Sequence, residues 1–136
     1  MNSTSRLLIR LAAAFGFIAV ATGAFGAHFL KNRFLLHQLD ADHLLDIYEK
    51  GVQYQFYHSF ALALAGLLLA HRPDSKWLPR AGWLFVAGMV FFSGSLYLLA
   101  CRDLLSFPVT WAGPVTPIGG VCFMGGWLAV FLGMRE

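Results

Sequence analysis

The sequence predicts an all-α polytopic membrane protein: four transmembrane helices in a compact left-handed bundle, with a short amphipathic interfacial helix between the first two. Three observations predict this fold. Four apolar stretches lack Asp, Glu, Lys and Arg, roughly at 11–27, 56–70, 81–101 and 118–134. Hydrophobic residues make up 58% of the chain and charged residues 12%, which is about half the usual share of charge. Small residues also recur at helical spacing within the stretches.

The first helix is expected from about Ser5 to Leu30, and Lys31 and Arg33 mark its exit from the membrane. With a rise of about 1.5 Å per residue, such a helix crosses a hydrocarbon core about 30 Å thick. The row of small residues in it leads directly into His28, which favours a retained helix over a cleaved signal peptide.

The segment from Asp40 to about Lys50 is predicted to form the interfacial helix. Apolar side chains recur in this region at i, i+3, i+4 and i+8: Leu44, Ile47, Tyr48 and Val52. The acidic residues project elsewhere, which is the pattern of an amphipathic helix. We expect this helix to lie on the membrane surface and to run into the second transmembrane helix near Gly51.

The remaining helices follow from breaker residues between the apolar stretches. The second is expected at about Gln53–Ala70 and the third at about Arg80–Cys101. The fourth is expected to start at Pro117, with Thr116 as its N-cap, and to end near Met134. No hydrophilic segment is long enough for another domain, so residues 1–136 form one transmembrane domain.

The basic residues are unequally divided between the two membrane sides. The side with the termini and the 71–80 loop carries six of them: Arg6, Arg10, Arg72, Lys76, Arg80 and Arg135. The other side carries four: Lys31, Arg33, Lys50 and Arg102. The positive-inside rule therefore favours cytoplasmic termini in a multi-pass membrane protein.

Small residues should form the contacts between helices. In membranes, helices associate closely where small side chains line a face. Their spacing alternates between three and four residues, a heptad-like rhythm that predicts left-handed crossings. The glycines expected to pack helices are Gly16, Gly23, Gly26, Gly66, Gly88, Gly119, Gly126 and Gly133.

Polar residues gather toward the side opposite the termini. The candidate ligand-binding residues are His58, Gln55, Tyr54, His28, Ser93, Ser95, Tyr97 and Thr116. Tyr54 and His58 are four residues apart, so they share one helix face. An ionisable group such as His58 is costly in a membrane unless it finds a partner, which makes it a functional candidate. The alternative is that His58 and His28 are polar contacts between helices.

Four segments closely resemble the signature segments of the YgdD/YwdK family of small, uncharacterised bacterial inner-membrane proteins. They are Gly23–His28, Gly51–His58, Phe92–Leu98 and Thr116–Gly120. The resemblance covers nearly the whole chain in the right order, although residues 28–51 form a longer connection than usual. It implies a four-helix membrane protein and marks the same polar residues, but it implies no activity.

The sequence contains no nucleophile–base pairing, phosphate-binding loop or intramembrane carboxylate pair, so it predicts neither an enzyme nor a metal or cofactor site. Scattered basic residues do not form a nucleic-acid surface.

The leading hypothesis is a polar intramembrane pocket, toward the extracytoplasmic side, that binds or passes a small ligand, proton or lipid headgroup. One alternative is a non-catalytic accessory or scaffold subunit. A third is a haem-binding or redox protein with His28 and His58 as ligands. Expected partners are membrane lipids and either further copies of the chain or a larger membrane complex.

Overall fold

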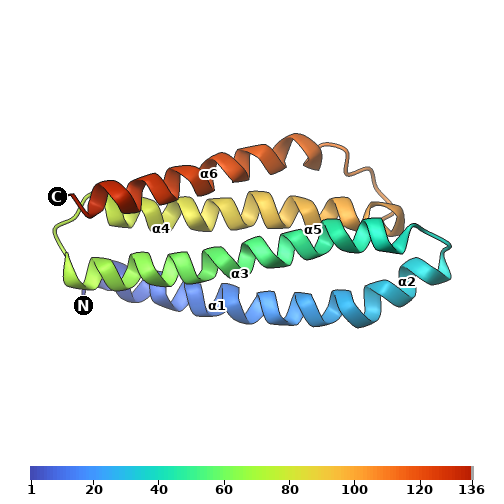
Figure 1. The fold of residues 1–136 in the computed structure, drawn as a ribbon, viewed down its shortest axis with the longest axis horizontal. Coiled ribbons are helices and arrows are strands. Elements are labelled where there is room, and N and C mark those ends of the chain that lie inside the picture. The colour runs from blue at the N-terminus through green and yellow to red at the C-terminus, as the bar shows by residue number, and fades with distance from the viewer. Residues whose placement is uncertain (136) are drawn as a thin grey trace.

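The computed structural model describes residues 1–135, which form helices and their connections only (Figure 1). The first helical rod comprises α1 (Ser3–Phe25), η1 (Gly26–Leu30) and α2 (Lys31–Leu36), and the second is α3 (Ala41–His71). The third comprises α4 (Trp77–Gly88), η2 (Met89–Ser93) and α5 (Gly94–Ala100). A short 3-10 turn, η3 (Arg102–Leu104), and a connection lead to α6 (Ala112–Gly133). The predicted all-α class is confirmed.

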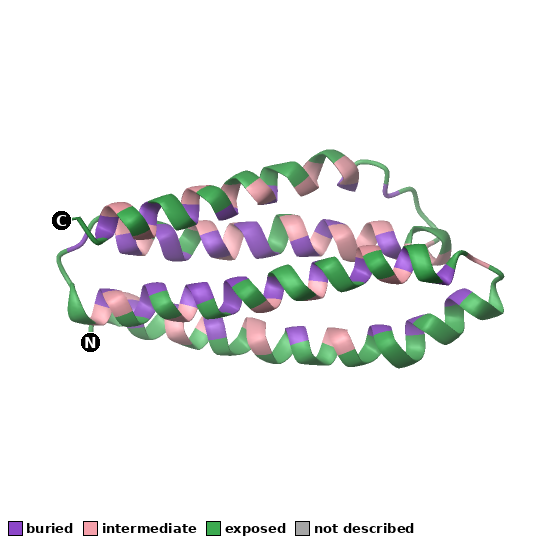
Figure 2. Cartoon of the chain, in the orientation of Figure 1, coloured by how far each residue is buried: buried purple, intermediate pink, exposed green. Residues whose placement is uncertain are grey.

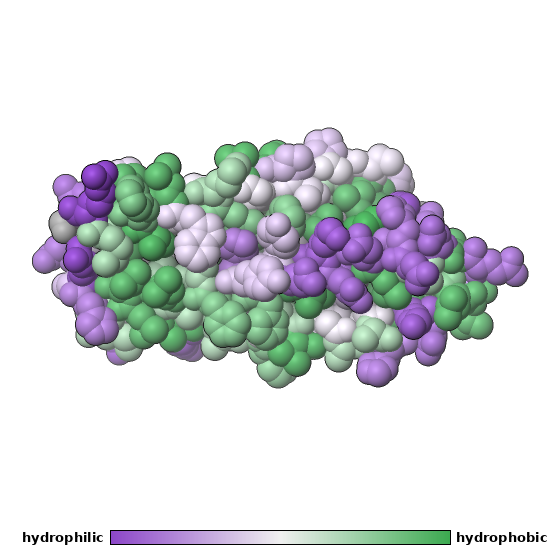
Figure 3. All heavy atoms as spheres, viewed as in Figure 1, coloured by the Kyte–Doolittle hydropathy of each residue, from purple (hydrophilic) through white to green (hydrophobic). Residues whose placement is uncertain are grey.

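Within residues 1–135, three helical segments are long and apolar enough to cross a membrane: Ser3–Leu36, Trp77–Ala100 and Ala112–Gly133. The remaining predicted crossing, 56–70, forms the second half of α3. The first half of α3 carries exposed charged side chains, among them Asp46, Glu49 and Lys50. Figure 3 shows hydrophilic side chains extending from one end of the molecule toward its middle along this helix.

The rods lie side by side in the order α1, α3, α4–α5, α6, with both termini at one end (Figure 1). The most extensive contacts join α1 to α3 and α4 to α6, and α3 contacts α4 and α5 between them. Buried residues face the neighbouring rods, whereas α1 and α6 expose much of their outer surfaces (Figure 2).

The core has two parts. The larger part, near the termini, packs Leu8 of α1, Leu62 of α3 and Phe85 of α4, each fully buried. The smaller part joins Leu30 and Phe34 to Leu44 and Tyr48, and it includes Ala100 at the end of α5.

This second cluster corrects the prediction of a separate interfacial helix. Residues 41–50 are the first turns of α3, continuous with its apolar half. Leu44 and Tyr48 do not face a lipid surface, because they pack against the extension of the first rod. That rod continues to Leu36 and does not end at Leu30. Its 34 residues reach about 51 Å, against a hydrocarbon core of about 30 Å.

The start of the last helix and two π-helical turns also differ from the sequence prediction. The last helix begins at Ala112, so Thr116 is not its N-cap, and Pro117 lies inside the helix. The Thr116 hydroxyl oxygen lies 3.3 Å from the carbonyl oxygen of Ala112, one turn earlier in the same helix. The π-helical turns η1 and η2 were not predicted.

Candidate functional site

A hydrogen-bonded network joins the first three rods, with Gln55 of α3 at its centre. The Gln55 amide Nε2 donates to the carbonyl oxygen of Phe15 at 2.9 Å. Its Oε1 accepts a 2.7 Å hydrogen bond from the Tyr97 hydroxyl of α5. Gln55 is 4% exposed, so these bonds replace water that the side chain cannot reach.

Tyr48 extends this network toward the end opposite the termini. Its hydroxyl donates to the carbonyl oxygen of Thr22 at 2.7 Å, and its ring lies 5.0 Å from that of Tyr97. Burial raises the pKa of the Tyr48 hydroxyl, and the neighbouring Tyr97 hydroxyl adds to this effect. Tyr48 therefore remains a protonated donor throughout the physiological pH range.

His58 is held through both ring nitrogens. Nδ1 lies 2.7 Å from the carbonyl oxygen of Tyr54, one turn earlier in α3. A carbonyl can only accept, so Nδ1 carries a proton and donates it. Nε2 accepts a hydrogen bond of 3.3 Å from the indole Nε1 of Trp127 in α6. This arrangement fixes a single neutral tautomer of His58.

Aromatic rings enclose the imidazole of His58. Phe123 of α6 stacks on it with centroids 3.5 Å apart and planes 9° apart, and Phe85 of α4 lies at 5.7 Å. Tyr54 stacks on Phe92 at 4.6 Å. His58 is 6% exposed, so its surroundings are aromatic and largely dry.

A separate polar contact joins α5 to α6. The hydroxyls of Ser95 and Thr116 lie 2.6 Å apart, so one of them donates to the other. The Ser95 hydroxyl oxygen also lies 2.9 Å from the carbonyl oxygen of Phe92. Ser93 is different. It lies at the end of η2 and is 1% exposed, and its hydroxyl has no hydrogen-bond partner.

The eight predicted residues therefore fall into three pairs and two isolated positions, Ser93 and His28. Gln55 meets Tyr97, Ser95 meets Thr116, and His58 meets Tyr54 through the backbone of Tyr54 and its ring. His28 lies in η1 with an exposed side chain. Within residues 1–135, no hydrogen bond joins His28 to the other candidates.

Several members of these groups were not predicted from sequence. Trp127 donates to His58, Thr22 accepts from Tyr48, and Ser59 donates to the carbonyl oxygen of Gln55 at 2.7 Å. Trp127 lies in the half of the last apolar stretch that is nearer the termini. Its depth along the chain therefore places it in one leaflet and the predicted polar residues in the other. Thr22 contributes a backbone carbonyl, which no sequence pattern marks.

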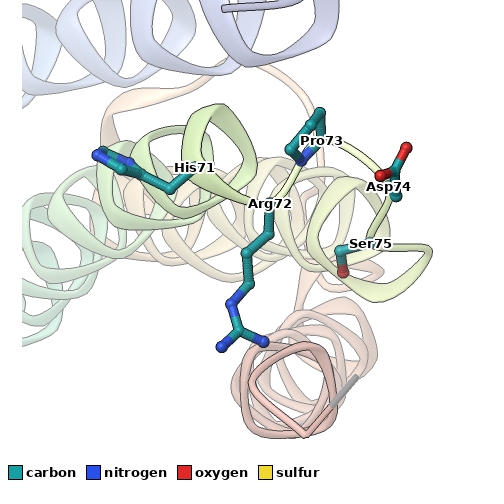
Figure 4. A pocket seen from close by; sticks show the side chains of 5 residues that line it. All are labelled: His71, Arg72, Pro73, Asp74 and Ser75. Atoms are coloured by element: carbon teal, nitrogen blue, oxygen red, sulfur yellow. The ribbon is translucent and has the colours of Figure 1, made fainter.

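A cavity of about 430 Å³ lies at the other end of the molecule, lined by the connection from His71 to Ser75 (Figure 4). The Arg72 side chain points toward the end of α6 (Figure 4), and its Nη1 donates to the carbonyl oxygen of Met134 at 3.4 Å. This connection ties α3 to α6. Across residues 1–135, no three His, Cys, Asp or Glu side chains gather closely enough to hold a metal ion.

Comparison with known proteins gives a family and no activity. A family model described as "Protein of unknown function (DUF423)" matches residues 22–120. UPF0382 membrane proteins of Staphylococcus aureus, for example from strains USA300 and N315, are 41% identical to the chain over 63 residues. These matches cover 46% of this chain and 47% of each relative, so the chain spans about half the length of the curated relatives it matches. No solved structure matches the chain.

The matched residues 22–120 include Gln55, His58 and Ser95, together with all four segments on which the family resemblance rests. Their partners Phe15, Phe123 and Trp127 lie outside the match. The model covers well over half of the chain, and the relatives are named as membrane proteins, which agrees with the long apolar helices. The protein therefore belongs to the DUF423 family, an uncharacterised family with membrane-protein members.

Proposed function

We propose that this protein is a non-catalytic accessory or scaffold subunit with four transmembrane helices, whose polar groups fasten the helices in one arrangement. The observation that carries this proposal is the bonding of His58. Both of its ring nitrogens are engaged and an aromatic ring stacks on its face. A histidine that passes protons or binds iron needs a free nitrogen, and this one has none in the observed arrangement. The outward-facing His28 likewise gives no support to a pair of haem ligands.

The position of α3 alongside α1 supports a fourth membrane crossing. Gly66 of α3 lies against Ile9, and Val52 lies against Gly23. Residues 52–66 therefore run beside residues 9–23, which form an apolar part of the first candidate span. We infer that residues 53–70 also cross the membrane, in a left-handed bundle with both termini in the cytoplasm of a bacterium. This membrane protein would be of the YgdD/YwdK type.

The outer face of α6 is the proposed surface for a partner. Val121, Met124, Leu128 and Phe131 are between 57% and 66% exposed. Their spacing of three, four and three residues is that of a helix–helix seam. The small residues of α6 face inward, where Gly119 and Gly126 contact Phe92 and Phe85. The partner would therefore meet large apolar side chains, supplied by a second copy or by another membrane subunit.

A second candidate function has one observation in its favour. The buried Ser93 hydroxyl has no partner, and an unsatisfied buried polar atom is costly. A small polar ligand or a water molecule beside η2 would satisfy it. A ligand-binding role near Ser93 therefore stays open beside the scaffold role.

Two variants of His58 test the scaffold proposal against the ligand or proton role. His58→Gln can still donate and accept hydrogen bonds, but it has no imidazole. We expect it to keep most of the thermal stability in detergent and the parent's native-mass-spectrometry stoichiometry. His58→Leu should lose about 1–3 kcal/mol of unfolding free energy, because Trp127 and Tyr54 lose their partner. Equal stability of His58→Leu and the parent would contradict the fastening role.

A second experiment tests the α6 surface. The double variant Met124→Ala/Leu128→Ala should dissociate the assembly in native mass spectrometry. A matched double variant at exposed positions elsewhere, Ile18→Ala/Val90→Ala, should leave the assembly intact. If the parent is monomeric and no partner co-purifies with it, the scaffold proposal fails.

A further inference from the structure

A groove of about 440 Å³ runs between α1 and α3, away from the polar groups described above. Small residues form its floor: Ala12, Ala13 and Gly16 on α1, with Ser59 and Ala63 on α3. The Ser59 hydroxyl is turned to the carbonyl oxygen of Gln55 at 2.7 Å. The surface offered by the groove is therefore almost wholly apolar.

Helix packing does not account for the small size of Gly16. A Cβ at Gly66 or Gly126 would approach a neighbouring side chain to 2.8 or 2.5 Å, so packing requires glycine there. A Cβ at Gly16 would meet only the Cβ of Ser59, at 4.0 Å, which is ordinary van der Waals contact. The open space above Gly16 is a feature of the surface.

The groove has the length of one leaflet. Along α1 it runs from Ile9 to Val20, and eleven residues of helix rise about 17 Å. Half of the hydrocarbon core is about 15 Å thick. The Ile9 end lies toward the termini, where Arg6 and Arg10 mark the membrane boundary. The groove therefore crosses the leaflet on the side of the termini.

Two cations stand at the boundary end of the groove. Arg6 and Arg10 are exposed and line a shallow cleft of about 250 Å³ with Ser3 and Leu7. Arg6 shares a helix face with Ala13 and Val20, seven and fourteen residues further on. Neither guanidinium forms an ion pair within residues 1–135. Residues 1–39 contain no Asp or Glu. Like charges at i, i+4 repel each other unless an anion lies between them.

We infer that this groove is a binding site for an anionic phospholipid of the leaflet on the side of the termini. One acyl chain lies on the small residues, and the phosphate lies between Arg6 and Arg10 as a charge-assisted hydrogen-bond acceptor. Phe17 and Phe60 are 76% and 66% exposed at the rims. These raised rims fit a narrow chain better than a helix about 10 Å across. This inference concerns a different surface from the proposed function and does not depend on it.

Native mass spectrometry of the delipidated full chain tests the site, with dioleoylphosphatidylglycerol and dioleoylphosphatidylcholine as probes. These lipids have the same acyl chains and differ in headgroup charge. The parent should bind the anionic lipid roughly thirtyfold more tightly, because each of the two arginines contributes a factor of about five near an anionic headgroup. Equal binding of both lipids would overturn the proposal.

Two matched pairs of variants locate the site. Ala13→Leu fills the groove, whereas Ala14→Leu adds the same volume at an exposed neighbour that does not line it. Ala13→Leu should weaken binding of both lipids about fivefold or more, and Ala14→Leu should not. Arg6→Gln/Arg10→Gln should abolish the preference for the anionic lipid, and Arg80→Gln at the same membrane side should preserve it. Equal behaviour within either pair would overturn the assignment.

A measurement on the unmodified chain covers the case in which a variant fails to fold. Phosphatidylglycerol that carries a photoreactive diazirine in its acyl chain should label peptides within residues 9–20 and 56–63. Labelling confined to other helices would overturn the site. The site would also be overturned if Ala13→Leu dissociated a dimer without changing lipid binding, because the groove would then hold a second copy.

Discussion

At the residue scale, the buried polar side chains show how this chain meets the cost of polarity in an apolar environment. Each of Gln55, His58 and Ser59 bonds a backbone carbonyl in addition to any side-chain partner. Carbonyl acceptors are available at every helical turn, and threonine, serine and histidine can reach the preceding turn of their own helix. Within residues 1–135, Ser93 is therefore the one buried side chain with a polar atom that lacks a hydrogen-bond partner.

Removing the Tyr97 hydroxyl should destabilise the protein measurably. In Tyr97→Phe, the buried Oε1 of Gln55 loses its 2.7 Å hydrogen bond. We expect a loss of about 1–3 kcal/mol of unfolding free energy. Tyr57→Phe is the control, because Tyr57 is 59% exposed, and it should change the free energy by less than about 0.5 kcal/mol. Thermal unfolding in detergent measures both, and similar values would show that the Gln55 network does not stabilise the fold.

The sequence predicted which polar residues matter better than it predicted their partners. Depth along each stretch identified Gln55, His58, Ser95 and Tyr97, because helix direction and distance from a charged end are readable from the chain. The sequence could not show that His58 bonds Trp127, because this contact depends on the position of α6 along the axis of α3. His28 was included for its depth and for its place in the Gly23–His28 segment. Its exposed position depends on the rotation of η1, which a π-helical turn changes.

At the element scale, close approaches of main chain fix the register between α6 and the third rod. A Cβ at Gly119 would clash with the backbone nitrogen of Phe92 in η2. Backbone atoms cannot rotate away as a side chain can, so one helix must move if Gly119 is replaced. At Gly126 the obstructing atoms belong to the Phe85 ring, which has somewhat more freedom to adjust.

The adjacent pair Gly119 and Gly120 offers a sharp test of this register. Gly119→Ala should cost about 1–3 kcal/mol of unfolding free energy or more, as overpacking does. At Gly120 the nearest atom to a new Cβ is Cδ2 of Phe92 at 4.0 Å, so Gly120→Ala should be neutral or stabilising by up to about 1 kcal/mol through helix propensity. Chemical or thermal denaturation of both variants decides the matter, and a destabilising Gly120→Ala with a neutral Gly119→Ala would refute the register.

The continuity of α3 is the clearest element that sequence patterns misjudged. The amphipathic pattern at Leu44, Tyr48 and Val52 was correct, because those side chains are buried or partly buried. The pattern does not reveal whether an apolar face meets lipid or another helix. Here Leu30 and Phe34 provide the partner surface, and this depends on the first rod continuing past Lys31.

A distance measurement separates the two arrangements of α3. Spin labels at Asp42 and Leu67, both exposed, are twenty-five residues apart on one face. A continuous helix separates the labelled backbones by about 38 Å. A helix that turned at Gly51 to lie in the membrane plane would bring them to about 28 Å. Double electron–electron resonance in lipid nanodiscs should give the longer distance, and a dominant population at the shorter one would contradict the structure.

At the scale of the whole molecule, the rods form a row in which α1 and α6 lie at opposite ends. Each end rod therefore has one side covered by its neighbour and a large apolar surface facing outward. Because α1 and α6 do not meet, their outer apolar surfaces are left for lipids or partner subunits to cover. The proposed lipid groove beside α1 and the proposed partner seam on α6 are different surfaces, so one contact would not exclude the other.

The arrangement predicts that alternate connections are reached from opposite sides of the membrane. We expect Gln38→Cys, between α2 and α3, and Ser106→Cys, between η3 and α6, to react with an impermeant maleimide on intact bacteria. Asp74→Cys, between α3 and α4, should react only after permeabilisation. The parent for these variants carries Cys101→Ser and Cys122→Ala, because both native cysteines are free thiols.

A swapped labelling pattern would show four crossings in the opposite orientation. The orientation rests only on the six-to-four bias of basic residues between the two sides. If Gln38→Cys and Asp74→Cys reacted from the same side, residues 53–70 would not cross the membrane, and the polar half of α3 would then explain why that helix stays outside.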